Sequence, residues 1–494
     1  MGQEVAARTF TRADRTRYRQ KVRRCLDVLE RMLRESRFAG GRQLIGCEIE
    51  LNLVDSRGEP VMRNAEVLDA IASPDFQTEL GQFNVEFNLP PRGLAGDSLA
   101  VLEKRLRADL NSAETAAQVL DAHLLMIGIL PTLTPAHLGA DALTAHPRYA
   151  LLNEQIFAAR GEDMPLTIDG AVERLRTTAE TIAPEAACTS VQFHVQVAPE
   201  SFGAYWNAAQ AIAGVQLAVG ANSPYLFGKE LWRETRIALF EQATDTRSDE
   251  LKEQGVRPRV WFGERWVTSI FDLFEENVRY FPALLPICDD EDPVEVMDRG
   301  DTPALGELRL HNGTVYRWNR PIYDVAEGVP HVRVENRVLP AGPTVVDTLA
   351  NAAFWFGLVR RLAEDERPVW SRLSFAAAED NFHSAARYGT EARLFWPGAG
   401  EVPASELVLR RLLPLAYEGL DRWGVAAPVR DRLLGIVEQR CLRATCGAQW
   451  QVDTVHALQE RHHLNRPEAL RRMTLRYAEH MHANEPVHAW PVES

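Results

Sequence analysis

The sequence predicts an α+β fold with a helical C-terminal extension. Two patterns predict it: apolar and polar residues alternate with a period of two in five short segments, and apolar residues recur at spacings of three and four in the longer segments around them. The composition agrees, because 494 residues with 46% hydrophobic and 25% charged have the balance of an ordinary globular enzyme. A disordered, fibrous or membrane protein is excluded on the same grounds.

Five segments have the apolar spacing of helices. In the first of them Tyr18, Val22, Leu26 and Leu29 lie on one face, between arginines, and the segment ends at two glycines. We interpret it as a packed helix with a solvated face and not as a membrane-surface helix, because acidic residues interrupt the arginines. The predicted helices are residues 15–37, 98–125, 205–219 and 344–363, with further helices through 407–463.

Five short segments alternate so regularly that each places its polar side chains on one face of a strand. These segments are residues 47–53, 83–89, 191–197, 307–311 and 332–338. Their polar faces carry Glu48, Glu50 and Asn52; Asn84, Glu86 and Asn88; Gln192, His194 and Gln196; Glu307, Arg309 and His311; and Arg333, Glu335 and Arg337.

Taken together, these polar faces favour a metal site. One such strand alone is better explained as the solvated face of a half-buried sheet. The five faces, however, contain no Thr, Lys or Ser, and two carboxylates at positions i and i+2, roughly 7 Å apart, repel unless a positive charge lies between them. Hard divalent ions such as Mg²⁺ or Mn²⁺ prefer carboxylate oxygens and accept an imidazole. We therefore interpret His194 as a metal ligand and not as a general base, and we leave the role of His311 open.

Arginine supplies nearly all of the positive charge. The chain has four lysines, and its other 51 basic residues are arginines, so any group that binds phosphate must be arginine. Arg309, Arg333 and Arg337 alternate with acids on the predicted strands, which suits an anionic ligand bridged by metal ions. The sequence has no Walker A motif, no G-x-G-x-x-G after a strand and no G-x-S-x-G, which counts against P-loop, Rossmann and serine hydrolase sites.

The charge balance and the apolar runs argue against two classes of partner. Lysine and arginine total 55 against 69 for aspartate and glutamate, so the net charge of −14 should repel nucleic acid. No apolar run approaches the roughly 18 to 20 residues that cross a bilayer. The N-terminal segment carries arginines where a secretory signal needs apolar residues. We expect a cytoplasmic protein without nucleic-acid or membrane partners, and the sequence leaves a homo-oligomer open.

From about Leu44 to Pro397 the chain resembles the second family of glutamate-cysteine ligases, the bacterial carboxylate-amine ligases with a glutamine-synthetase-like fold. The motifs that carry the resemblance are Gly46-Cys47-Glu48-Ile49-Glu50-Leu51, Asn84-Val85-Glu86-Phe87-Asn88, the segment 191–197 with His194, Asn222-Ser223-Pro224-Tyr225-Leu226-Phe227-Gly228 followed by Arg236, Arg317-Trp318-Asn319-Arg320-Pro321, His331-Val332-Arg333-Val334-Glu335-Asn336-Arg337, and Asn381 with Ala385-Ala386-Arg387-Tyr388-Gly389. Each motif is weak alone, but their order is specific.

The resemblance implies an antiparallel sheet curved into a funnel-like active site with helices packed outside. ATP and Mg²⁺, with Mn²⁺ as an alternative, would lie at one end of the funnel and glutamate at the other. The metal ligands that it implies are Glu48, Glu50, Glu86, His194 and Glu335. The arginines that it implies are Arg309, Arg337 and Arg387 for catalysis, and Arg236, Arg320 and Arg333 for binding the nucleotide.

The activity that the resemblance implies is an ATP-dependent ligation. A carboxylate, with the γ-carboxylate of glutamate as first choice, would be joined to an amine, with cysteine as first candidate, through an acyl phosphate. Gln192 and Gln196 stand where the family often has histidine, and residues after Pro397 extend the chain, which leaves the amine open. Two alternatives remain: a guanidino-type phosphotransferase on a related fold, and a non-catalytic paralogue that binds nucleotide or glutamate.

Three domains are expected on this basis. Residues 1–42 would hold the N-terminal amphipathic helix, residues 43–400 the catalytic domain, and residues 401–494 the helical C-terminal extension.

Overall fold

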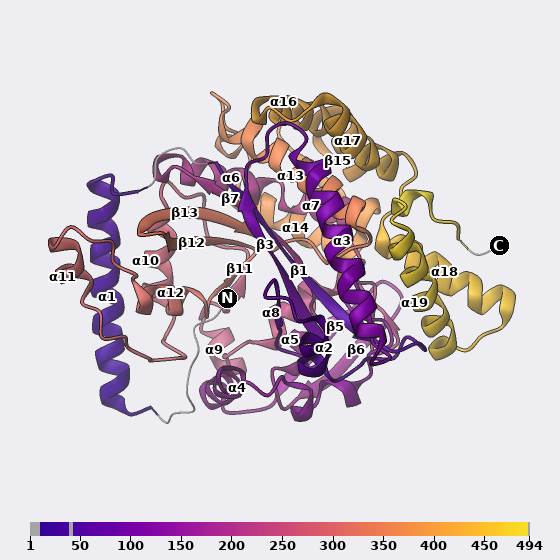
Figure 1. Ribbon diagram of the computed structural model, residues 1–494, viewed down its shortest axis with the longest axis horizontal. Coiled ribbons are helices and arrows are strands. Elements are labelled where there is room, and N and C mark those ends of the chain that lie inside the picture. The colour runs from indigo at the N-terminus through magenta and orange to yellow at the C-terminus, as the bar shows by residue number, and fades with distance from the viewer. Residues whose placement is uncertain (1–9, 39–42, 493–494) are drawn as a thin grey trace.

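A curled antiparallel sheet forms the centre of the protein, as seen in a computed structural model that describes residues 10–38 and 43–492 (Figure 1). The strand order is β12-β13-β7-β1-β3-β2, and β4 also pairs with β1. The strands are β1 (Ile45–Val54), β2 (Phe76–Thr78), β3 (Asn84–Arg92), β4 (His123–Leu125), β7 (Val191–Val197), β12 (Asn319–Ala326) and β13 (Val329–Asn336). The predicted α+β class with a curved antiparallel sheet is confirmed.

The register of this sheet brings the predicted polar residues together. Glu50 on β1 lies opposite Glu86 on β3, and His194 on β7 lies opposite Glu335 on β13. Strand β1 lies between β7 and β3, so residues from four strands share one face. The alternating apolar residues of β1, such as Ile49, are buried on the other side. Four of the five predicted strands therefore form as expected.

Helices cover the apolar side of the sheet. Phe193 of β7 contacts Trp355 and Phe356 of α13, with ring centroids 6.2 and 5.9 Å apart. The helices as far as Tyr388, apart from α12, are α1 (Arg12–Arg34), α2 (Asn64–Ile71), α3 (Ser98–Gln118), α4 (Pro147–Arg160), α5 (Ala183–Ala186), α6 (Phe202–Ala211), α7 (Ala213–Gly220), α8 (Thr235–Ala243), α9 (Asp249–Glu253), α10 (Ile270–Tyr280), α11 (Pro293–Asp298), α13 (Val345–Ala363) and α14 (Phe375–Tyr388). The described residues contain no helix that is both long and apolar enough to cross a bilayer.

The segment 307–311, expected to be a strand, is instead the helix α12 (Gly306–Asn312). The helix begins after Leu305, whose φ of 50° turns the chain. Leu308 and Leu310 are both buried, and so are most of the polar residues between and beside them. Alternation over only five residues is equally compatible with a short buried helix, which is why the prediction was wrong.

Two predicted helices differ in extent. The helix expected over 98–125 ends at Gln118, because the chain turns at Asp121 with a φ of 48° and then enters β4. The helix expected over 205–219 is divided into α6 and α7 at Ile212. The first helix and the helix at 344–363 form close to the predicted positions.

The C-terminal residues are helical, as predicted, and pack directly on α13. Gly357 and Gly419 let α13 and α16 approach so closely that a side chain at either position would overlap the backbone of the other helix. The elements here are β14 (Arg393–Trp396), β15 (Gly400–Pro403), α15 (Ala404–Leu407), α16 (Leu413–Trp423), α17 (Ala427–Leu442), α18 (Gly447–His462) and α19 (Arg466–Ala483). The predicted domain boundaries at residues 42 and 400 stay a prediction.

Candidate active site

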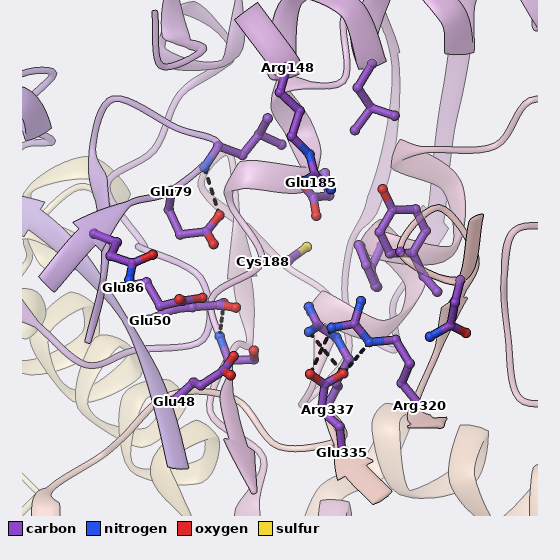
Figure 2. Close-up of a pocket in the computed structure, with 18 of the residues that line it drawn as sticks. Glu48, Glu50, Glu79, Glu86, Arg148, Glu185, Cys188, Arg320, Glu335 and Arg337 are labelled. Carbon is purple, nitrogen blue, oxygen red and sulfur yellow. Dashed lines mark hydrogen bonds and ion pairs between the residues drawn. The ribbon is translucent and has the colours of Figure 1, made fainter. Parts of the chain in front are cut away.

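The polar face of the sheet lines a cavity of about 700 Å³. Nine of the eleven predicted site residues line it: Glu48, Glu50, Glu86, Glu335, Arg236, Arg309, Arg320, Arg333 and Arg337. Figure 2 shows glutamates on one side of this cavity and Arg320, Arg337 and Glu335 on another. The described lining residues also come from α4, α5, α8 and α12, so helices close the side of the cavity that the sheet leaves open.

Three of the predicted metal ligands form one group, which we call the histidine cluster: Glu48, His194 and Glu335. His194 Nε2 lies 3.1 Å from Glu48 Oε1 and 3.9 Å from Glu335 Oε1. Burial raises the pKa of Glu48, but His194 outweighs burial and brings it to about 2. Burial likewise opposes ionisation of Glu335, and the arginines beside it, Arg320 first, hold its pKa below the ordinary value. Both carboxylates are therefore charged at neutral pH.

A second group, the glutamate cluster, contains Glu50, Glu79 and Glu86. Within each cluster the candidate ligand atoms all lie within 4.8 Å of one another. Burial raises the pKa of all three carboxyls, that of Glu86 to about 7 with a further contribution from the charge of Glu48. The pKa of Glu79 is raised mainly by burial and further by the charges of Glu86 and Glu50. The charge of Arg337 lowers the pKa of Glu50 but does not outweigh burial, so the protein does not fully neutralise these three carboxyls.

Hydrogen bonds hold the glutamate cluster in place. Glu50 accepts from the Ser190 backbone N–H at 2.6 Å and from the Gln192 side-chain amide at 2.8 Å. Asn88 donates to Glu86 at 2.6 Å, and Glu79 accepts from the Leu80 backbone N–H at 2.8 Å. One oxygen of each acid lies within 4.8 Å of the others, where a shared cation would relieve the repulsion.

Both clusters have the donor atoms that a divalent cation needs. His194 Nε2 and Asn84 Oδ1 are buried, and among the described residues neither has a hydrogen-bond partner of good geometry, although His194 Nε2 lies 3.1 Å from Glu48 Oε1. Carboxylate oxygens with a single imidazole suit Mg²⁺ or Mn²⁺. One contact would have to change, because Arg333 Nε donates to His194 Nδ1 at 3.2 Å and so leaves the ring proton on Nε2. With a cation at Nε2 the ring proton would lie on Nδ1, which could then no longer accept the hydrogen bond from Arg333.

The arginines of the cavity are held by acids and backbone oxygens. Arg320 binds Glu335 through two hydrogen bonds, one of them 2.8 Å long. Arg337 Nη1 donates to Gln192 Oε1 at 2.5 Å and lies 3.6 Å from Glu335 Oε2. Arg309 binds Asp324 at 2.8 Å. These guanidinium groups therefore surround the cavity opposite the glutamate cluster.

Two further arginines lie on either side of this arrangement. Arg333 shares Asp324 with Arg309, at 3.1 Å. Arg236 is 2% exposed and pairs with Glu234 at 3.0 Å, and its other guanidinium nitrogens face backbone carbonyls. Arg236 thus lines the cavity but directs its hydrogen bonds into the protein.

The structure does not bring Arg387 to the cavity. It lies in the last turn of α14, not in a loop, and its exposed guanidinium stacks over Trp232, 4.8 Å from the ring centroid. Glu79 and Glu185, by contrast, line the cavity and were not predicted. Glu79 follows a strand of only three residues, and Glu185 lies on a helix of a single turn. Neither residue therefore belongs to an alternating sequence pattern long enough to predict a place in the site.

His311, whose role the sequence left open, is a buried structural residue. Its Nε2 donates to the Asn277 carbonyl at 2.9 Å. Burial lowers its pKa to about 4. Because the unfolded chain binds this proton near pH 6.5 and the folded chain does not, stability should be lost as the pH falls from about 6.5 to 4.

We expect His311→Gln to make the free energy of unfolding less dependent on pH between about 6.5 and 4. The free energy of unfolding of the wild type should fall more steeply with decreasing pH than that of the variant, by up to about 1.4 kcal/mol per pH unit for one proton. Urea unfolding at several pH values between 7 and 4 measures both slopes. Parallel curves for the two proteins would show that folding does not lower the pKa of His311.

The antiparallel half-barrel places acids and arginines around one cavity, and these are the side chains that a site for metal-bridged anions needs. Residues 44–463 match the family model described as glutamate-cysteine ligase family 2 (GCS2). This chain belongs to that family, and the resemblance carried by its motifs is confirmed. Because the chain belongs to this family, the protein is a ligase.

Solved structures with a similar fold agree. Glutamate-cysteine ligase from Francisella tularensis, in complex with AMP, has a TM-score of 0.55 and 12% identity over 92% of this chain and 91% of that chain. A bifunctional glutathione synthetase from Pasteurella multocida has a TM-score of 0.52 and 11% identity, over 93% of this chain and 55% of that one. At these identities the likeness concerns the fold alone. A search of curated proteins found no match.

Proposed function

We propose that this protein is an ATP-dependent carboxylate-amine ligase. The acid is glutamate, reacting at its γ-carboxylate, and cysteine is the first candidate for the amine. The observation that carries the proposal is the cavity itself, in which two carboxylate clusters face the arginines of one sheet in a chain of this ligase family. The AMP bound by the Francisella ligase supports an adenine nucleotide as the second substrate.

The first step would transfer the γ-phosphoryl group of ATP to the substrate carboxylate. Mg²⁺ held by the two clusters would neutralise the phosphate oxygens and align them with the acid. Arg337 and Arg320 would stabilise the charge that develops on the phosphoryl group, since both guanidinium groups line the cavity and are held by Glu335. The product is an acyl phosphate and ADP.

Glu185 would serve the second step. Its carboxylate makes no hydrogen bond or ion pair with any residue that the structure describes, and it lines the cavity without belonging to either cluster. Burial, aided by the charge of Glu50, raises its pKa to about 7, while Arg337 lowers it. A carboxylate with this pKa is suited to take a proton from an ammonium group near neutral pH.

The ammonium group of the acceptor gives one proton to Glu185, and its nitrogen lone pair forms a bond to the acyl carbon. The bond from that carbon to the phosphate oxygen breaks, and the phosphate leaves with the electron pair. The second nitrogen proton leaves with the phosphate, and an amide remains.

We expect Glu185→Gln to lower kcat by about 100-fold, the range typical of general-base catalysis. The wild-type rate should fall below about pH 7, because protonated Glu185 cannot accept a proton, and the variant should lose this dependence. Steady-state rates between pH 5.5 and 8.5 test it. A variant that keeps both the wild-type rate and its acid limb would exclude Glu185 from proton transfer.

The proposed function is tested by ADP release from the full chain with ATP, Mg²⁺, glutamate and a panel of amines, cysteine first, with product masses as the readout. ADP release that needs both the acid and the amine supports the ligase. ADP release with a guanidino compound and no amide product would indicate a phosphotransferase instead. No ADP release with any pair would indicate a paralogue that only binds its ligands.

A further inference from the structure

Two C-terminal helices, α18 and α19, bind one buried side chain, Asn222. Asn222 follows α7 and is fully buried, as are Gln451 of α18 and Tyr477 of α19. Asn222 Nδ2 donates to the Tyr477 hydroxyl at 2.8 Å and to the Ala341 carbonyl at 2.7 Å. Asn222 Oδ1 accepts from Gln451 Nε2 at 2.9 Å. Both hydrogens of this amide and one lone pair of its oxygen are thus used by two C-terminal helices and one loop.

From Asn222 the contacts continue to the strand end that carries Arg337. The Asn222 backbone N–H donates to Glu234 Oε2 at 2.7 Å, and Arg236 Nε donates to Glu234 Oε1 at 3.0 Å. The guanidinium of Arg236 also donates to the Val338 carbonyl. Arg337 precedes Val338, so the position of its backbone depends on this chain of contacts.

A second route leads from Tyr477 to the metal-ligand strands. The Tyr477 hydroxyl donates to the Met126 carbonyl at 2.7 Å. The next carbonyl, that of Ile127, accepts from Asn52 Nδ2 at 3.1 Å, and Asn52 Oδ1 accepts from Asn84 Nδ2 at 3.1 Å. Asn52 lies two residues after Glu50 on β1, and Asn84 two residues before Glu86 on β3.

We propose that Tyr477 is a positioning residue of the active site, through which α19 fixes both Arg337 and the glutamate cluster. The inference rests on the proposed function for its kinetic effect. Tyr477 lies beyond residue 463, where the match to the family model ends, so this role belongs to the extension of this chain. A buried polar network of this kind is sensitive to single losses, because each removed partner leaves another group unpaired.

Tyr477→Phe tests the proposal because it removes only the hydroxyl and keeps the ring that packs on Trp450 and Trp490. We expect kcat to fall at least tenfold with KM values within about threefold, and Mn²⁺ binding to weaken at least threefold in a direct titration of the full chain. The matched control is Thr474→Val, on the same helix, where a buried hydroxyl without a partner is removed. This control should keep wild-type kcat and Mn²⁺ affinity.

Gln451→Met provides a second variant, because it removes the hydrogen bond to Asn222 from α18 and leaves Tyr477 intact. It should show the same changes to a smaller degree. A lowered melting temperature with unchanged kcat and unchanged Mn²⁺ affinity in both variants would make the network purely structural and overturn the proposal. A wild-type chain that releases no ADP would refute the proposed function instead, and the Mn²⁺ titration would then decide the positioning role.

Discussion

Glu50→Gln should reduce turnover at least about 100-fold, equivalent to about 2.7 kcal/mol of transition-state stabilisation. Glu50 lies opposite Glu86 across the β1–β3 pair and belongs to the glutamate cluster, so the amide removes a ligand charge from the centre of the proposed metal site. The melting temperature should stay within about 3 °C of the wild type or rise. Burial already raises the pKa of this carboxyl, and a neutral side chain relieves its repulsion with Glu79 and Glu86.

The matched control for this variant is Glu114→Gln. Glu114 has the same exposure as Glu50, 7%, but binds His123 and the Leu124 backbone N–H away from the cavity. The control should lose stability and keep its kcat. Steady-state rates at saturating Mg²⁺ and thermal melts of both variants provide the comparison. Near-wild-type turnover of Glu50→Gln would remove the glutamate cluster from the chemistry.

Part of this site follows from strand parity alone. A period of two places alternate residues on one face whatever the register, and four of the predicted strands became neighbours in one sheet. Glu48, Glu50, Glu86 and Glu335 could therefore be expected to converge. Parity does not say which acids share a cation, and the division into two clusters depends on the β1–β3 and β7–β13 registers.

Other parts depend on tertiary contacts that no local pattern contains. Glu79 and Glu185 reach the cavity from a turn and from a short helix, so only the folded chain brings them near β1. Arg309 reaches the same cavity from a helix where a strand was expected. Arg387 matched a family motif, but the C-terminal turn of α14 directs it onto Trp232 instead. A motif identifies a residue and its neighbours in the sequence, whereas the direction of a side chain at a helix end depends on tertiary packing.

Arg337 and Arg387, which both belong to family motifs, are therefore expected to behave differently. Arg337→Lys should lower kcat/KM at least about tenfold, or about 1.4 kcal/mol. Arg337 bridges Gln192 and Glu335, and Gln192 in turn holds Glu50, so a planar fork connects the two carboxylate clusters. An ammonium keeps the charge but cannot reproduce that fork. Burial favours a lower pKa for Arg337, but the charges of Glu335 and, second, of Glu50 keep the pKa above its ordinary value. The Arg337 guanidinium therefore stays charged.

Arg387→Lys should leave kcat and KM within about twofold of the wild type, because its guanidinium is exposed and stacks outside the cavity. Steady-state kinetics beside thermal melts of the two variants separate a catalytic role from a structural one. If Arg337 only stabilises the fold, Arg337→Lys lowers the melting temperature and leaves the kinetic constants of the folded fraction unchanged. Loss of activity in both variants would show that Arg387 contributes to turnover in spite of its position outside the cavity. A loss at Arg337 alone would assign the bridge between the clusters to phosphoryl transfer.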